Sequence, residues 1–132
     1  MKVTADTNVL VRAVTGDHVE QSRAAKSALQ RAETVAIPIP ALCEFVWVLS
    51  QGYKISPSEI AEAIRRFING ANAIVDQPAV EAGLAILDAG GDFADGVIAY
   101  EGNWLGADTF VSFDKRAVKL LGGQGKSARL LT

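Results

Sequence analysis

Acidic residues at widely separated positions are the side chains of this 132-residue chain that are best suited to chemistry. Asp6 comes directly after a short apolar run, and Asp114 follows a second, strongly β-prone run in the same way. Asp92 and Asp95 are three residues apart at the expected start of a helix, so they share one face. Several carboxylates in one crevice stay ionised only if a cation neutralises them, and hard oxygen ligands select Mg²⁺ or Mn²⁺.

Glu44 is a fifth acid of interest because of its neighbours. All the other residues from Ala41 to Leu49 are apolar, which predicts a helix with little solvent-facing surface. Burying an isolated carboxylate there is costly unless a cation or a strong set of donors compensates. The alternative is a glutamate in the first turn that points to water and is stabilised by the helix dipole.

Each of the aspartates also has a purely structural interpretation. Asp6 and Asp114 are suited to capping the helix that follows each of them, since aspartate is a preferred N-cap residue. Asp92 as N-cap with Asp95 at the third helical position explains that pair equally well. The sequence therefore leaves open whether Asp92 binds a metal or only caps its helix.

Short strands alternating with longer helices must position these acids. The pattern predicts strands at residues 3–5, 35–37, 73–75, 109–113 and 128–131. It predicts helices at 8–14, 17–31, 40–52, 56–68, 78–89, 92–105 and 115–121, with Asp17 as the cap of the second and Glu20 three residues later. This order predicts an α/β fold, in which helices cover both faces of a mainly parallel sheet of about four to five short strands, and one domain over residues 1–132.

Composition limits the functional classes. Hydrophobic residues make up 49% and charged residues 21% of the chain, as in ordinary globular proteins. The 13 basic and 15 acidic residues give a net charge of −2, so any polyanion has to be held by a local patch or a metal. The single cysteine, Cys43, excludes an internal disulfide, and no run of apolar residues is long enough for a membrane span, so we expect a cytoplasmic location.

Four short motifs give the sequence a family resemblance. Asp6-Thr7-Asn8, Glu44 in its apolar helix, the stretch from Asp92 to Ala99, and Ser112-Phe113-Asp114-Lys115 occur in this order. Together they resemble the acidic motifs of PIN-domain ribonucleases, and specifically VapC-type toxins of bacterial toxin-antitoxin pairs. The resemblance extends from Lys2 to Leu121. Gly96 is a departure, because relatives often have alanine there.

The resemblance implies a three-layer α/β/α domain that hydrolyses RNA with one or two Mg²⁺ or Mn²⁺ ions. Carried over residue by residue, it makes Asp6, Glu44, Asp95 and Asp114 the catalytic acids and metal ligands, with Asp92 as an accessory acid. It further implies a homodimer, a VapB-like antitoxin that covers the acidic site, and RNA as the substrate.

Neighbouring polar residues receive supporting roles. Thr7, Asn8 and Ser112 are expected to be donors that orient the carboxylates, although Ser112 is equally well explained as a turn residue. Lys115 and Arg116 are candidate phosphate contacts beside Asp114. Trp47 is either a core residue or part of a subunit interface.

Other interpretations of the chain are weaker. Residues 123–127 resemble the end of a phosphate-binding loop, but the glycine required five residues before Gly125 is Leu120. A receiver-like domain needs an adjacent acidic pair near the first strand, where Asp6 stands alone. The strongest rival is a catalytically inactive PIN-like module that binds RNA or protein.

Overall fold

The computed structural model describes all residues from Met1 to Thr132. It contains seven α-helices, one π-helical turn and five short strands, and every strand pair is parallel. This confirms the predicted α/β class and agrees with an α/β/α fold; the strands form one sheet of three and another of two. The chain divides into two compact units, Met1–Asp76 and Gln77–Thr132.

The elements follow one another in the predicted order. They are β1 (Lys2–Thr4), α1 (Thr7–Val14), α2 (Val19–Arg31), β2 (Thr34–Ala36), α3 (Ile39–Trp47), η1 (Val48–Gly52), α4 (Pro57–Ile68), β3 (Ala73–Ile74), α5 (Gln77–Asp88), α6 (Phe93–Trp104), β4 (Phe110–Ser112), α7 (Lys115–Gly123) and β5 (Ala128–Leu130).

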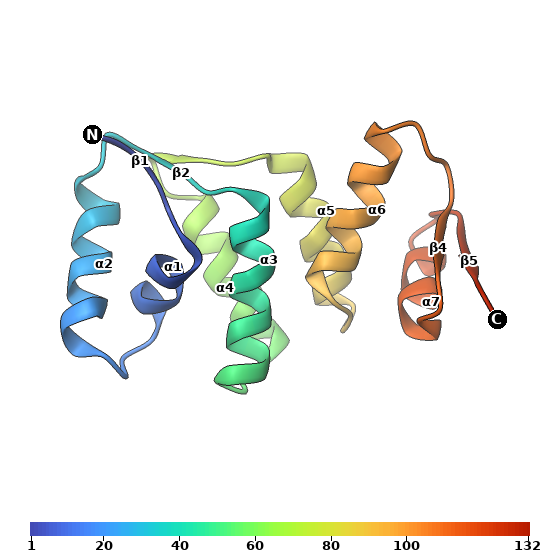
Figure 1. Ribbon diagram of the computed structural model, residues 1–132, viewed down its shortest axis with the longest axis horizontal. Helices are drawn as coiled ribbons and strands as arrows, with labels where there is room; N and C mark the ends of the chain where they lie inside the picture. The colour runs from blue at the N-terminus through green and yellow to red at the C-terminus, as the bar shows by residue number, and fades with distance from the viewer. The chain divides into compact units, whose positions relative to one another are not determined.

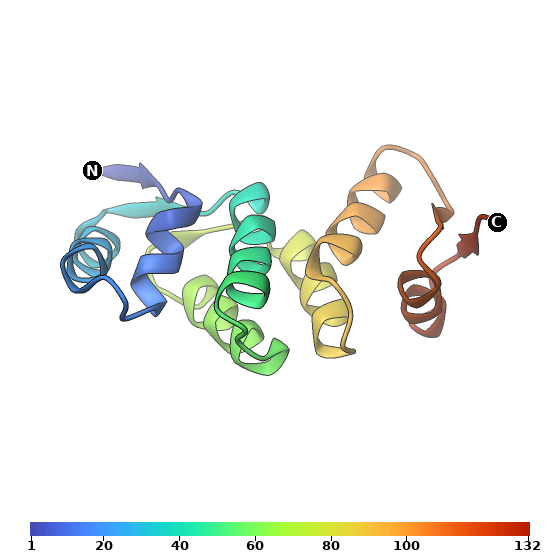
Figure 2. The same cartoon turned by 60° about the horizontal axis from the view of Figure 1, so that its bottom comes forward.

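The N-terminal unit is built on the three-stranded sheet, in which β2 lies between β1 and β3. Val35 of β2 pairs with Val3 on one side and with Ala73 on the other. Figures 1 and 2 show α1 between α2 and α3, and α1 packs on both of them. The ring of Phe45 is fully buried and meets the ring of Phe67 edge-on, with the centroids 5.5 Å apart.

The C-terminal unit combines a helical hairpin with a strand–helix–strand segment. The helices α5 and α6 run antiparallel to one another (Figures 1 and 2) and pack closely. β4 and β5 pair in parallel, with Phe110 opposite Ala128, and α7 connects them. Just after α7, the side-chain amide of Gln124 donates to the Ala85 carbonyl at 2.9 Å, which joins this segment to α5.

The start of α2 differs from the prediction. The N-cap is His18, whose Nδ1 accepts a hydrogen bond from the Gln21 backbone N–H at 3.1 Å, so the expected cap at Asp17 is wrong. The Asp17 carboxylate instead accepts hydrogen bonds from Arg12 and Tyr53. Asp17 therefore binds Tyr53, which is distant in sequence, and does not cap α2.

The helix α3 corrects the expectation for Glu44. The buried residues Ala41, Leu42, Phe45 and Val46 form one stripe, while Glu44 is exposed. The prediction that this carboxylate is buried is therefore wrong, because the apolar residues do not enclose the whole helix. None of the helices of the structure is both long and apolar enough to cross a membrane.

Candidate active site

In the N-terminal unit, the start of α1 brings two of the predicted acids into one hydrogen-bonded group. Asp6 is the N-cap of α1, and its Oδ1 accepts from the Thr7 backbone N–H at 2.7 Å. The buried Thr7 hydroxyl donates to Glu44 Oε1 at 3.1 Å. Thr7 therefore joins Asp6 to Glu44, as expected for a residue that orients carboxylates. Asn8 is exposed on the same turn.

In the C-terminal unit, Asp114 has a similar place at the start of a helix. It is the N-cap of α7, and its Oδ1 accepts from the backbone N–H groups of Arg116 and Ala117 at 2.9 and 3.2 Å. The Ser112 hydroxyl oxygen accepts from the Asp114 backbone N–H at 3.0 Å, which is a turn interaction rather than a contact with the carboxylate. The side chains of Lys115 and Arg116 are exposed beside this turn.

Asp92 and Asp95 occupy the start of α6. Asp92 is the N-cap and accepts from the Ala94 backbone N–H at 3.1 Å, so its capping role is confirmed. Asp95 is in the first turn and is partly buried. Burial, followed by the charges of Asp92 and then Asp114, raises the pKa of Asp95 above its ordinary value. Asp92 and Asp114 are thus each close enough to Asp95 to oppose its negative charge.

The structure places the predicted ligands in two groups. Asp6 and Glu44 belong to the N-terminal unit, and Asp92, Asp95 and Asp114 belong to the C-terminal unit. Nowhere in the chain do three or more histidine, cysteine, aspartate or glutamate side chains form a group that could hold a metal ion.

The donor atoms in both groups nevertheless suit a hard divalent cation. Asp6, Asp92 and Asp114 each use only Oδ1 in capping, so Oδ2 of each is free to bind a cation. None of the five acids forms an ion pair with lysine or arginine. Oxygen ligands with uncompensated negative charge are those that Mg²⁺ and Mn²⁺ prefer.

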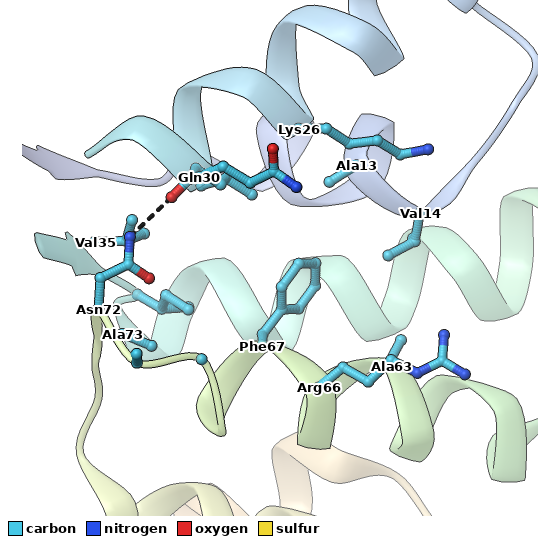
Figure 3. Close-up of a pocket in the computed structure, with 14 residues that line it drawn as sticks. Ala13, Val14, Lys26, Gln30, Val35, Ala63, Arg66, Phe67, Asn72 and Ala73 are labelled. Atoms are coloured by element: carbon cyan, nitrogen blue, oxygen red, sulfur yellow. Dashed lines mark hydrogen bonds between the residues drawn. The ribbon is translucent and has the colours of Figure 1, made fainter. Parts of the chain in front are cut away.

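An apolar groove lies elsewhere in the N-terminal unit. It has a volume of about 540 Å³ and is lined from α1, α2, β2 and α4. Figure 3 shows the ring of Phe67 in this groove, with Lys26 and Arg66 on its two sides and the Asn72 amide donating to a backbone carbonyl, that of Leu29, at 2.9 Å. Because it contains none of the predicted acids and is mostly apolar, this groove is suited to binding rather than to hydrolysis.

Comparison with protein families provides the context for these groups. The family model for the PIN domain matches residues 3–120, a range that includes all five acids. PIN domains are generally nucleases and typically use divalent metal ions. The search among curated proteins finds no match. Since the family match spans nearly the whole chain, the protein belongs to the PIN domain family.

Proposed function

We propose that the protein is a metal-dependent endoribonuclease of the VapC toxin type, in which both units act as one PIN domain over residues 1–132. In this proposal Asp6, Glu44, Asp95 and Asp114 bind one or two Mg²⁺ or Mn²⁺ ions, and Asp92 is an accessory acid. The supporting observation is the environment of Asp95, where burial and two like charges raise the pKa and no basic side chain compensates. A bound cation would remove that repulsion.

In this proposal the metal activates water, and side chains of the protein orient the metal ligands and contact the RNA. A bound metal lowers the pKa of a coordinated water and stabilises negative charge on the phosphate. Thr7 holds Glu44 through its hydroxyl, and the capping hydrogen bonds fix the orientation of Asp6 and Asp114. The exposed Lys115 and Arg116 are available to contact RNA phosphates.

The proposed partners are a VapB-like antitoxin and a second copy of the chain. The apolar groove that contains Phe67 suits the apolar side chains of a protein segment better than RNA, and the cationic Lys26 at its edge suits an acidic residue of such a segment. Trp47 is 66% exposed, which excludes the core alternative and favours an interface. A short neighbouring reading frame that encodes a DNA-binding protein would support the antitoxin assignment.

The test is incubation of the 132-residue chain with total RNA, in Mn²⁺ or Mg²⁺ and then with excess chelator, followed by mapping of the cut ends. We expect defined internal cuts that chelator abolishes. Asp95→Asn and Asp6→Asn should each lower the rate by at least about 100-fold, since each removes a proposed ligand charge. Asp108→Asn is the matched control, because Asp108 is an exposed aspartate outside both acidic groups.

Undiminished cleavage by Asp95→Asn would contradict the proposed site. An inactive binding module would instead retain RNA in the presence of metal without cutting it. Calorimetric titration with Mn²⁺ alongside the cleavage assay separates these two outcomes.

A further inference from the structure

Three polar side chains form a second connection between the helices that bear Asp6 and Glu44. The Arg12 guanidinium of α1 donates through Nη1 to Asp17 Oδ1 at 3.2 Å and to the Tyr53 hydroxyl at 3.1 Å. The Tyr53 hydroxyl in turn donates to Asp17 Oδ2 at 2.8 Å. We call Arg12, Asp17 and Tyr53 the polar clamp. Arg12 also donates through Nε to Gln21 of α2 at 2.8 Å.

The polar clamp lies beyond the acids along the same pair of helices. Asp6 and Thr7 are at the start of α1, and Arg12 lies about 7.5 Å beyond Thr7 along the helix axis at 1.5 Å per residue. Glu44 is in α3, which continues through η1 to Gly52, directly before Tyr53. The helix α1 is therefore connected to the α3–η1 segment at one point by the Thr7–Glu44 hydrogen bond and at another by the polar clamp.

The backbone directly before Tyr53 is a π-helical turn, which affects the direction of the tyrosine side chain. The residues Val48–Gly52 form a π-helical turn, and the Tyr53 backbone N–H donates to the Val48 carbonyl at 3.3 Å. A π turn holds about one residue more than an α turn, which rotates the following side chains by about 100°. Lys54 then adopts a left-handed conformation with φ of 55°.

The clamp is suited to orienting rather than to stabilising. Tyr53 is half-buried and the side chain of Asp17 is 54% exposed, and exposed ion pairs add little to folding stability. The Tyr53 hydroxyl accepts from the Arg12 cation and donates to the Asp17 anion, so each of its two hydrogen bonds has a defined direction. That geometry restricts how α3 and η1 slide or rotate against α1.

We propose that Tyr53 is a positioning residue for the metal site, which holds α3 against α1 so that Glu44 keeps its place beside Thr7 and Asp6. The inference rests on the proposed function, since it assigns Glu44 to metal binding. Tyr53 acts through Glu44 and does not touch the metal or RNA.

The test compares the two tyrosines of the 132-residue chain, each of which loses only its hydroxyl. Tyr53→Phe should weaken Mn²⁺ binding in calorimetry roughly three- to tenfold, less than the loss typical of a direct partner of a metal ligand. The Mn²⁺ concentration for half-maximal RNA cleavage should rise by the same factor, with the KM for RNA unchanged. Tyr100→Phe is the control, because the Tyr100 hydroxyl accepts from Trp104 in the other unit.

Two further variants test whether the effect of Tyr53→Phe on Mn²⁺ binding comes from the loss of the clamp hydrogen bond. Asp17→Ala removes the acceptor of the same hydrogen bond, so the double variant with Tyr53→Phe should bind Mn²⁺ no worse than whichever single variant binds it less tightly. Arg12→Lys keeps the charge but loses the planar donor pair, and it should weaken Mn²⁺ binding in the same direction if Tyr53→Phe does not fold.

The outcomes separate the two proposals. If the wild type cleaves RNA and Tyr53→Phe has an unchanged Mn²⁺ affinity, the positioning role is overturned while the nuclease proposal stands. A loss of kcat without any change in Mn²⁺ affinity also overturns it. If the wild type binds Mn²⁺ but cleaves no RNA, the nuclease proposal fails, and the Mn²⁺ affinity of Tyr53→Phe still decides the positioning role.

Discussion

Gly96 lies beside Asp95 on α6 and faces the backbone of α5, and replacing it tests whether this packing positions the acid. A Cβ atom at Gly96 would overlap the Ala82 carbonyl oxygen and would lie 2.9 Å from the Ala82 carbonyl carbon and 3.0 Å from the Gly83 Cα. All three neighbours are backbone atoms, so no side-chain rotation relieves the overlap. An alanine at this position would force the hairpin apart.

The magnitude follows from two opposing terms. Inserting a methyl group into a packed region costs about 1–3 kcal/mol, and the rigid backbone places Gly96→Ala toward the upper end. Alanine gains about 1 kcal/mol over glycine in helix propensity, which leaves a net loss of about 1–2 kcal/mol. Gly102→Ala is the matched control on α6, because nothing lies within 4 Å of its Cβ position, and it should gain about 1 kcal/mol.

The assay is urea denaturation of both variants and the wild type without metal. Because the propensity gain is common to both substitutions, the difference between them isolates the packing term. We also expect Gly96→Ala to cleave RNA more slowly than Gly102→Ala, since Asp95 is the adjacent residue. Equal stability of the two variants would refute the reasoning.

Two further predictions concern ionised groups. In urea denaturation without metal at pH 7, Asp95→Asn should be more stable than the wild type by about 0.5 kcal/mol, the size of an exposed like-charge repulsion. Added Mn²⁺ should make the wild type the more stable of the two. If Asp95→Asn is less stable than the wild type without metal, the repulsion from Asp92 and Asp114 is contradicted. The Tyr53 hydroxyl, more than Arg12, lowers the pKa of Asp17, so the folding stability that ionised Asp17 provides is present above its ordinary pKa of about 4 and is lost as the pH falls below that value. The difference in the free energy of unfolding between wild type and Asp17→Asn should therefore shrink from pH 7 to pH 3. A difference that stays constant over this range would count against the clamp.

The sequence predicted the order of helices and strands because their signals are local. Pro40 and Pro57 stand in the first turns of α3 and α4, and aspartates cap α6 and α7, each within a few residues of the element it starts. Boundaries shifted by only a residue or two for most elements. Local chemistry was sufficient for these features.

The predictions from sequence were wrong where the place of a side chain depends on a residue distant in sequence or on which face of a helix is exposed. Asp17 was available as a cap for α2, but Tyr53, 36 residues away, binds its carboxylate and His18 caps instead. Glu44 was expected to be buried because all the other residues from Ala41 to Leu49 are apolar, yet Glu44 and the apolar Trp47 are both exposed. An apolar residue can face outward, so composition alone did not reveal which side of α3 is the core.

The hardest question for the sequence was whether an aspartate caps a helix or binds a metal, and the structure indicates that these roles are compatible. Asp6, Asp92 and Asp114 each use one carboxylate oxygen for capping, which fixes the side chain and leaves the other oxygen free. A ligand held in this way loses little further freedom on binding a cation. What distinguishes a proposed ligand is therefore uncompensated charge, and by that criterion Asp95 is the most informative acid of the chain, because burial and its two acidic neighbours oppose its ionisation.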